Sequence, residues 1–337
     1  MEHKNARKRL IYSLLIFIAA LVIANVFISS VETEIETPPK KSTSTIQIDS
    51  VLSKVLADFG FENKWHKKYK LRSNQKPPLK VKHKVTLPND VSTIEFIAEF
   101  NSNITFDDVK LIIDEEEING DSDIEVYAAD TLKYWVTLTR DAKLEREKGA
   151  FVFLLTDVNQ LNKKQSQKLF FSPYSFGLLI TPSSKSKILL NKINKARKEY
   201  SVILSDDIDE EIFKLEPDYA TSRLERSVIN IVNNFGGAIN FYINKSSDIY
   251  KSTSYNFVKD EFSERGKYLK LIHQINKIEA DSEEDLKSLF DFYHQSIKKN
   301  ERKQLLISAE DFLKIQDRIK QIVKRGYKIL APSELNN

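Results

Sequence analysis

An uncharged, apolar run near the N-terminus constrains this chain more than any other feature of its sequence. Residues 10–28 contain no charged side chain and consist mostly of Leu, Ile, Val, Phe and Ala. At about 1.5 Å of rise per residue, a helix of this length is roughly long enough to cross a bilayer core of about 30 Å. No other stretch of the chain has this character, so the sequence predicts one transmembrane helix.

The charges on either side of this run predict its orientation. Basic residues precede it and acidic residues follow it: Lys4, Arg7, Lys8 and Arg9, then Glu32, Glu34 and Glu36. Because basic flanks stay in the cytoplasm, we expect residues 1–9 to form a cytoplasmic tail. A cleaved signal peptide is the alternative, but its apolar core would be only about 7–15 residues long. The sequence therefore predicts a signal-anchored, single-pass protein of the inner (cytoplasmic) membrane, with its C-terminal bulk extracytoplasmic or periplasmic.

Composition excludes several kinds of site. The 337 residues include no cysteine, which excludes disulfides, thiolate metal ligands and a cysteine nucleophile. The 52 basic and 48 acidic residues nearly cancel, to a net charge of +4. Since nucleic-acid binders concentrate positive charge, this mixed surface argues against nucleic acid as a partner.

The remainder of the chain divides into a linker and two predicted domains. Residues 29–45 are polar and contain Pro38-Pro39, which is typical of a linker. Residues 46–145 combine an amphipathic helical pattern with several alternating strand patterns, which predicts a small α+β domain. A charged segment, residues 143–149, separates it from a second domain at residues 149–335.

The second domain has a different pattern, in which short apolar runs alternate with amphipathic helical stretches. The seven apolar runs are residues 151–155, 176–180, 202–204, 238–242, 268–272, 305–307 and 327–330. Continuous apolar strands between helices predict βα units around a parallel sheet. Seven such units fit an incomplete or distorted seven-strand βα barrel, with a doubly wound open sheet as the alternative, and periodicity does not separate the two.

Four segments of this domain resemble motifs of the divergent polysaccharide deacetylase family. Residues 151–157 (Phe-Val-Phe-Leu-Leu-Thr-Asp) are similar to the strand that ends in its Asp-Asp-x-Gly turn, and residues 176–182 to its second strand and following Pro. Residues 236–240 (Gly-Gly-Ala-Ile-Asn) resemble the lead-in to its Asn-Asn-His-Met-Gly-Ser motif. Residues 325–335 resemble its closing Gly, strand and Ser-Glu-Leu. The resemblance implies a distorted βα barrel and metal-assisted removal of N-acetyl groups from sugars.

The chain departs from this family at the positions that would hold the metal. Asp157 matches the first Asp of the pair, but Val158 occupies the place of the second. Ser205 stands in the turn after the third strand, where the family has His, and Tyr242 replaces the motif His. Because Val, Ser and Tyr are poor ligands at neutral pH, the inherited metal site is predicted to be lost and no cofactor is expected.

Two hypotheses follow for the function. In the first, the domain is a pseudoenzyme that binds a glycan or a protein of the cell envelope, with Asn240, Phe241 and Tyr242 as candidate ligand-binding residues. The aromatic rings of Phe241 and Tyr242, expected at the mouth of the fourth strand, would stack on a sugar ring. In the second, it is an active metal-dependent carbohydrate deacetylase or hydrolase with a rebuilt site. The candidate catalytic residues of that alternative, and ligands of its divalent metal, are Asp157, Asp206, Asp207 and His273.

Overall fold

The computed structural model describes Phe17, Ile18, Ala20, Leu21 and residues 42–71, 79–115, 120–146 and 148–336. Most of the predicted transmembrane run and most of the linker lie outside these residues, so the predicted anchor and its orientation remain predictions. Within the described part of the chain, no helix combines the length and apolar character needed to cross a bilayer.

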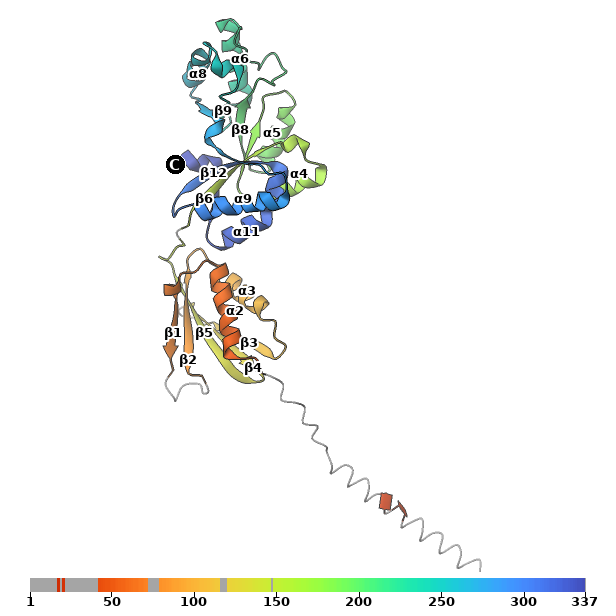
Figure 1. The fold of residues 1–337 in the computed structure, drawn as a ribbon, viewed down its shortest axis with the longest axis vertical. Coiled ribbons are helices and arrows are strands. Elements are labelled where there is room, and N and C mark those ends of the chain that lie inside the picture. Colours follow the sequence, from red (N-terminus) through yellow and green to blue (C-terminus); the bar gives the residue numbers. More distant parts are fainter. Residues whose placement is uncertain are drawn as a thin grey trace, which may run out of the picture.

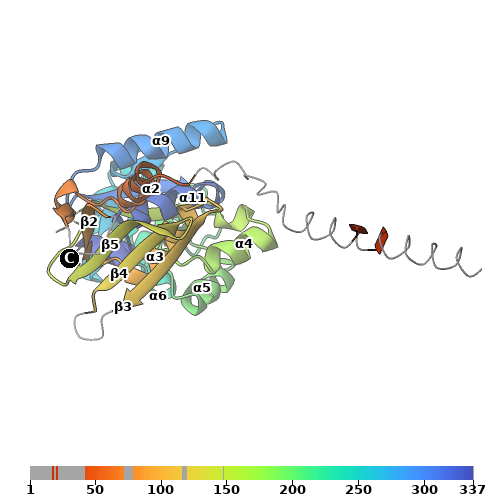
Figure 2. The same cartoon turned by 90° about the horizontal axis from the view of Figure 1, so that it is seen from below.

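The N-terminal unit is a five-stranded sheet with two helices. Its elements are α2 (Thr45–Asp58), η1 (Asn63–Trp65), β1 (His66–Lys70), β2 (Val81–Pro88), α3 (Thr93–Asn103), β3 (Val109–Glu115), β4 (Ser122–Ala128) and β5 (Thr131–Asp141). The strand order is β1-β2-β5-β4-β3, and Figure 2 shows β2, β5, β4 and β3 side by side. Only the β2–β5 pair is parallel.

Alternation of buried and half-buried residues along β4 and β5 explains how this sheet forms a core. One face of each strand is buried, and the apolar stripes of α2 and α3 belong to the same core cluster. The α2 helix begins at a capping box, in which Ser44 and Gln47 satisfy each other's backbone N–H groups. The expected α+β arrangement of helices and strands is therefore present in this unit.

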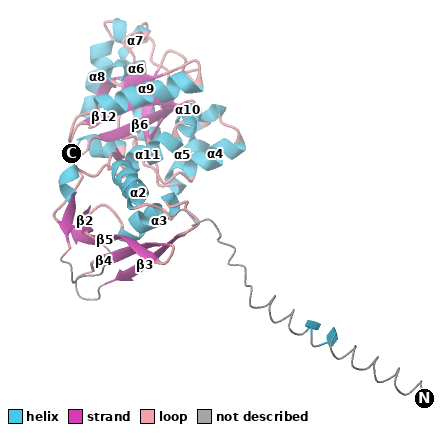
Figure 3. Ribbon diagram, turned by 60° about the horizontal axis from the view of Figure 1, so that its bottom comes forward, coloured by secondary structure: helices cyan, strands magenta, loops and turns pink. Residues whose placement is uncertain are grey.

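The C-terminal unit is a parallel sheet flanked by helices. Its strands are β6 (Ala150–Thr156), β7 (Gly177–Ile180), β8 (Glu199–Leu204), β9 (Phe241–Ile243), β10 (Leu269–Leu271), β11 (Asn276–Ile278), β12 (Arg302–Ser308) and β13 (Lys328–Leu330). Its helices are α4 (Lys163–Phe170), α5 (Ser186–Lys195), α6 (Thr221–Phe235), α7 (Asp248–Lys251), α8 (Tyr255–Glu264), α9 (Glu283–Ser296), α10 (Ala309–Lys314) and α11 (Gln316–Lys324), with short 3-10 turns η2 (Val158–Gln160), η3 (Ile272–Gln274) and η4 (Pro332–Asn336). Figure 1 and Figure 3 show these helices packed around the strands.

The strand order gives this sheet the form of a half-barrel. It runs β10-β9-β8-β7-β6-β12-β11, with β13 also paired to β6, and every pair is parallel. The edge strands β10 and β11 are consecutive in the chain and are joined only by the short turn η3 (Ile272–Gln274). The two edges therefore meet at one connection, which curls the sheet and fits a distorted βα barrel.

Apolar side chains pack on both faces of the curled sheet. Outward-facing residues such as Phe151 and Phe153 join the large core beneath the helices. A smaller cluster, the interior cluster, consists of Leu154, Leu179, Tyr242, Ile272, Ile275 and Leu306. Burial of both faces explains why the strands are continuous apolar runs rather than alternating ones.

Candidate functional site

The mouth of the half-barrel, where the parallel strands end, contains a cavity of about 960 Å³. Leu179, Ile203 and Leu306 contribute an apolar floor, which continues into the interior cluster. Polar residues that follow the strand ends form the rim: Thr156, Asp157, Asp207, Asn244, His273, Lys277, Glu279, Ser308 and Asp311. In βα barrels, functional groups gather at this end of the strands, so the mouth is the candidate site.

Asp157 directly follows β6, the first strand of the half-barrel, and has an unusual backbone conformation. Its φ is 58°, in the left-handed region that few residues other than glycine adopt. Its Oδ2 accepts a hydrogen bond from the Thr156 hydroxyl, and its Oδ1 accepts one from the Gln160 amide at 3.1 Å. Both carboxylate oxygens are thus already engaged by neighbours in the chain.

The adjacent residues Asp206 and Asp207 differ in what their side chains contact. Both oxygens of Asp206 accept from the backbone N–H of Asp248, at 3.1 and 3.2 Å, so this carboxylate holds the first turn of α7. Asp207 lines the mouth cavity, whereas Asp206 is absent from its lining. The structure therefore assigns Asp206 a structural contact and Asp207 a place at the site.

His273 lies in η3, the connection between the two edge strands, and is exposed at the mouth. The structure thus brings Asp157, Asp207 and His273 to one cavity, as the sequence predicts from their positions after strand ends. Asp311, which no sequence pattern singled out, also lines this cavity, and it accepts a hydrogen bond from the Ser308 hydroxyl at 2.8 Å. Even so, no three His, Asp or Glu side chains among the described residues lie close enough together to hold a metal ion.

The expected position of the Phe241 and Tyr242 rings at the mouth is wrong. The rings of Phe241 and Tyr242 belong to strand β9 itself and are only 1% and 3% exposed. The ring centroid of Phe241 lies 5.2 Å from that of Phe262 beneath the helices, and Tyr242 belongs to the interior cluster. Asn240 is buried at the opposite, amino-terminal end of β9. Neither ring offers a face to a sugar.

Tyr242 is instead a buried polar group of the barrel interior. Its hydroxyl accepts a hydrogen bond from the Gln304 amide at 3.2 Å, and burial raises the pKa of its phenol. We expect Tyr242→Phe to lower the free energy of unfolding by about 1 kcal/mol, because the Gln304 amide loses its partner. Urea denaturation followed by circular dichroism measures this change. An unchanged stability would contradict the interior contact.

Comparison with known proteins does not establish a family for this chain. No family model and no curated protein matches this sequence. The chain is similar to a solved structure described as a mutant of a CE4 family pseudoenzyme with restored enzymatic activity. That similarity has 9% identity and a TM-score of 0.36, over 67% of this chain and 91% of the other.

Proposed function

We propose that this protein is a membrane-anchored, extracytoplasmic relative of the polysaccharide deacetylases that has lost the catalytic metal site and binds a cell-envelope glycan at the barrel mouth. The observation that carries the proposal is a large, polar-rimmed mouth at which the described residues form no metal-ligand set. Val158, Ser205 and Tyr242 occupy the positions that the family resemblance assigns to ligands. The anchor rests on the apolar run at residues 10–28.

Coordination chemistry supports the loss of catalysis. A catalytic metal with an open position needs about three inward-pointing protein ligands. Asp157 engages both oxygens with Thr156 and Gln160, and Asp206 engages both with the backbone of α7. The mouth contains Asp157, Asp207, His273 and Asp311, but among the described residues no three such side chains lie close enough together to hold an ion.

The same mouth suits a ligand rich in hydroxyl groups. Carboxylate and amide oxygens of Asp207 and Asn244 are acceptors for sugar hydroxyls, and the Ser308 side chain lies on the same rim. The apolar floor can pack against the C–H face of a sugar ring. A volume of about 960 Å³ is near the upper end of the roughly 300–1,000 Å³ found for small-ligand sites. We therefore expect a short oligosaccharide rather than a single sugar.

Isothermal titration calorimetry with a tetramer of N-acetylglucosamine tests this proposal. We expect saturable binding that is unaffected by chelator and releases no acetate. Asp207→Ala and Asn244→Ala should each weaken binding about 5- to 10-fold, because each removes hydrogen bonds at the rim. The matched control is Asp260→Ala, an exposed carboxylate on α8 away from the mouth.

A different set of results would show that the mouth is catalytic. If a divalent metal co-purifies in stoichiometric amount, if Asp157→Ala or His273→Ala removes it, and if the protein releases acetate from the tetramer, then the mouth is an active deacetylase site. Absence of binding together with absence of metal would refute both the glycan proposal and this alternative.

A further inference from the structure

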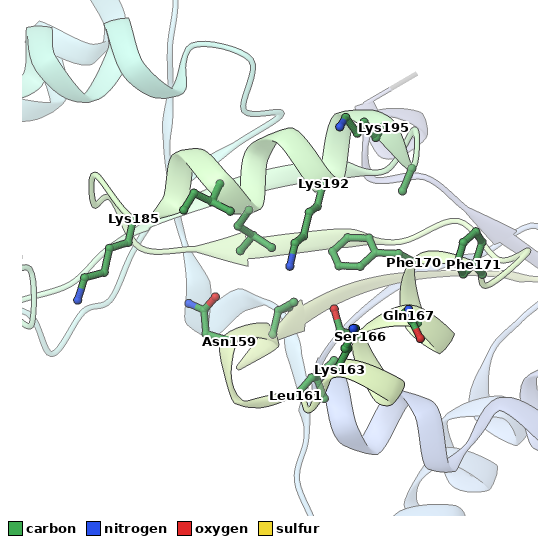
Figure 4. Close-up of a pocket in the computed structure, with 14 residues that line it drawn as sticks. Asn159, Leu161, Lys163, Ser166, Gln167, Phe170, Phe171, Lys185, Lys192 and Lys195 are labelled. Carbon is green, nitrogen blue, oxygen red and sulfur yellow. The ribbon is translucent and has the colours of Figure 1, made fainter.

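A second hollow lies on the outer surface of the half-barrel, between helices α4 and α5. It has a volume of about 940 Å³ and is lined by these two helices and the loop after β6. Figure 4 shows the two helices facing each other across it, with Lys192 extending from α5 toward α4. We call this hollow the α4/α5 groove. It opens to the outside of the barrel, whereas the mouth opens at the strand ends.

The charge of the groove has one sign. Lys163, Lys185, Lys192 and Lys195 line it, and none of its 14 lining residues is acidic. Lys163, Lys192 and Lys195 form no ion pair with any described residue. Lys185 precedes the first residue of α5, and Lys192 and Lys195 follow on the helix, so that the three span ten residue steps, or about 15 Å. Such a row of positive charges complements an elongated anionic partner.

The groove also exposes apolar surface that a solvated helix pair would normally avoid. Phe171 is 86% exposed and Ile188 is 69% exposed, and both line the groove. Its floor contains Val158, which is buried, and Leu161 and Leu189, which are half-buried. A partner must therefore present apolar side chains to the floor as well as acidic groups to the lysines.

From this combination we propose that the α4/α5 groove is a docking site for an acidic amphipathic helix of a partner protein. A helix laid between two others presents apolar residues at i, i+3, i+4 and i+7 to the floor, and acidic residues on its flanks to the lysines. A flat anionic bilayer reaches the lysines but not the recessed floor. A polyanionic glycan has no apolar side chains for that floor.

The probe for this proposal is a fluorescein-labelled, 18-residue model helix with Leu at i, i+3, i+4 and i+7 and Glu on the flanks. Its fluorescence anisotropy is followed as the full-length chain, held in phosphatidylcholine nanodiscs, is added. We expect saturable binding that weakens as salt is raised, because the rim contacts are exposed charges. A peptide of the same composition in scrambled order should bind at least about tenfold more weakly, since it presents no apolar face.

Variants on one helix separate the groove from general positive charge. The double substitution Lys192→Glu with Lys195→Glu should weaken binding at least about tenfold, and Ile188→Ser about fivefold. The matched control is Lys187→Glu, an exposed lysine of the same helix outside this lining, which should change affinity less than about twofold. No saturable binding up to about 1 mM protein would overturn the proposal. Equal effects of the groove variants and the control variant would also overturn it. A third result against it is a parent chain that binds phosphatidylglycerol vesicles but not the model helix, and a double variant that no longer binds those vesicles.

Discussion

Replacing Arg146 with alanine is expected to lower the free energy of unfolding of the N-terminal unit by about 3 kcal/mol and to uncouple it from the half-barrel. Arg146 is only 8% exposed and joins the two units. Its guanidinium donates to Asp90 Oδ2 at 2.9 Å and to the carbonyl oxygen of Phe59 at 2.8 Å, and also to the carbonyl of Lys324 in the half-barrel. Alanine leaves all three acceptors without their donor, which costs more than the loss of an exposed pair.

The two tryptophans allow this prediction to be measured directly. Trp65 and Trp135 both lie in the N-terminal unit, so tryptophan fluorescence follows that unit, whereas far-UV circular dichroism follows the whole chain. We expect the two signals to change together in urea for the parent chain. In Arg146→Ala, the fluorescence midpoint should fall and separate from the dichroism midpoint.

Arg140→Ala is the matched control for this substitution. Arg140 is an exposed arginine six residues earlier and donates to the carbonyl of Asn89 at 2.9 Å. Its loss should change stability by no more than about 0.5 kcal/mol. If Arg146→Ala behaves like Arg140→Ala, the contact between the units contributes little to stability.

Alanine substitutions at two glycines test the same contact between the units without changing the charge of the chain. Gly60 and Gly266 have nearly equal positive φ values, +67° and +68°. Both alanine variants incur the left-handed backbone cost, roughly 1–2 kcal/mol. Only at Gly60 would the new Cβ meet another unit, at 2.6 Å from the carbonyl oxygen of Arg325, while nothing lies within 4 Å at Gly266. An excess loss of stability in Gly60→Ala over Gly266→Ala therefore reports the contact between the units.

The strand framework was predictable because burial on both faces leaves a continuous apolar run. All seven runs that the sequence assigns to strands of the second domain contain or overlap a strand. The sequence missed β11 (Asn276–Ile278), a short edge strand in which only Ile278 is buried. It also missed β1 (His66–Lys70), an edge strand whose last four residues are exposed and whose Lys-rich sequence lacks apolar alternation.

The candidate site was only partly predictable. Position after a strand end was enough to bring Asp157, Asp207 and His273 to one rim. It could not show that Asp206, adjacent to Asp207, would bond to the backbone of α7. Nor could it show which way Phe241 and Tyr242 point, because both faces of β9 are buried and both side chains are aromatic.

The sequence also did not indicate that a charged residue between the two units would be buried. The segment at residues 143–149 has the composition of a solvated separator between domains. In the structure, its Arg146 is buried and bonded to both units, because carbonyl groups of two distant segments converge on it. Such convergence depends on how the two units meet, which local composition does not encode.

The N-terminal unit contains a buried chain of titratable side chains beside its edge strand. His83 on β2 is 4% exposed, and its Nδ1 lies 2.9 Å from both His66 Nε2 on β1 and the Tyr134 hydroxyl on β5. Tyr134 in turn donates to Asp49 on α2, which also pairs with Lys68. Burial, and then the proximity of His66, lowers the pKa of His83 to about 4 from its ordinary 6.5.

This shift makes the stability of the N-terminal unit depend on pH. Between about pH 6.5 and 4, the unfolded chain holds a proton on His83 that the folded chain does not. The stabilisation is therefore complete above about pH 6.5 and is lost as the pH falls toward 4, by up to about 3 kcal/mol. Burial lowers the pKa of His66 as well, which acts in the same direction. Burial raises the pKa of Asp49, but hydrogen bonds from Tyr134 and Lys68 outweigh it, so Asp49 titrates below its ordinary 3.8 and outside this range.

Urea unfolding followed by tryptophan fluorescence at pH 7.5 and pH 4.5 measures this effect in the parent chain and in His83→Gln. Glutamine keeps a hydrogen-bonding group between His66 and Tyr134 but cannot take up the proton. The parent chain should lose about 2–3 kcal/mol more than His83→Gln over this interval, because all other carboxylates and histidines are common to both. If both chains lose stability equally, His83 is not the group that the fold holds neutral, and the acid sensitivity of this unit arises elsewhere.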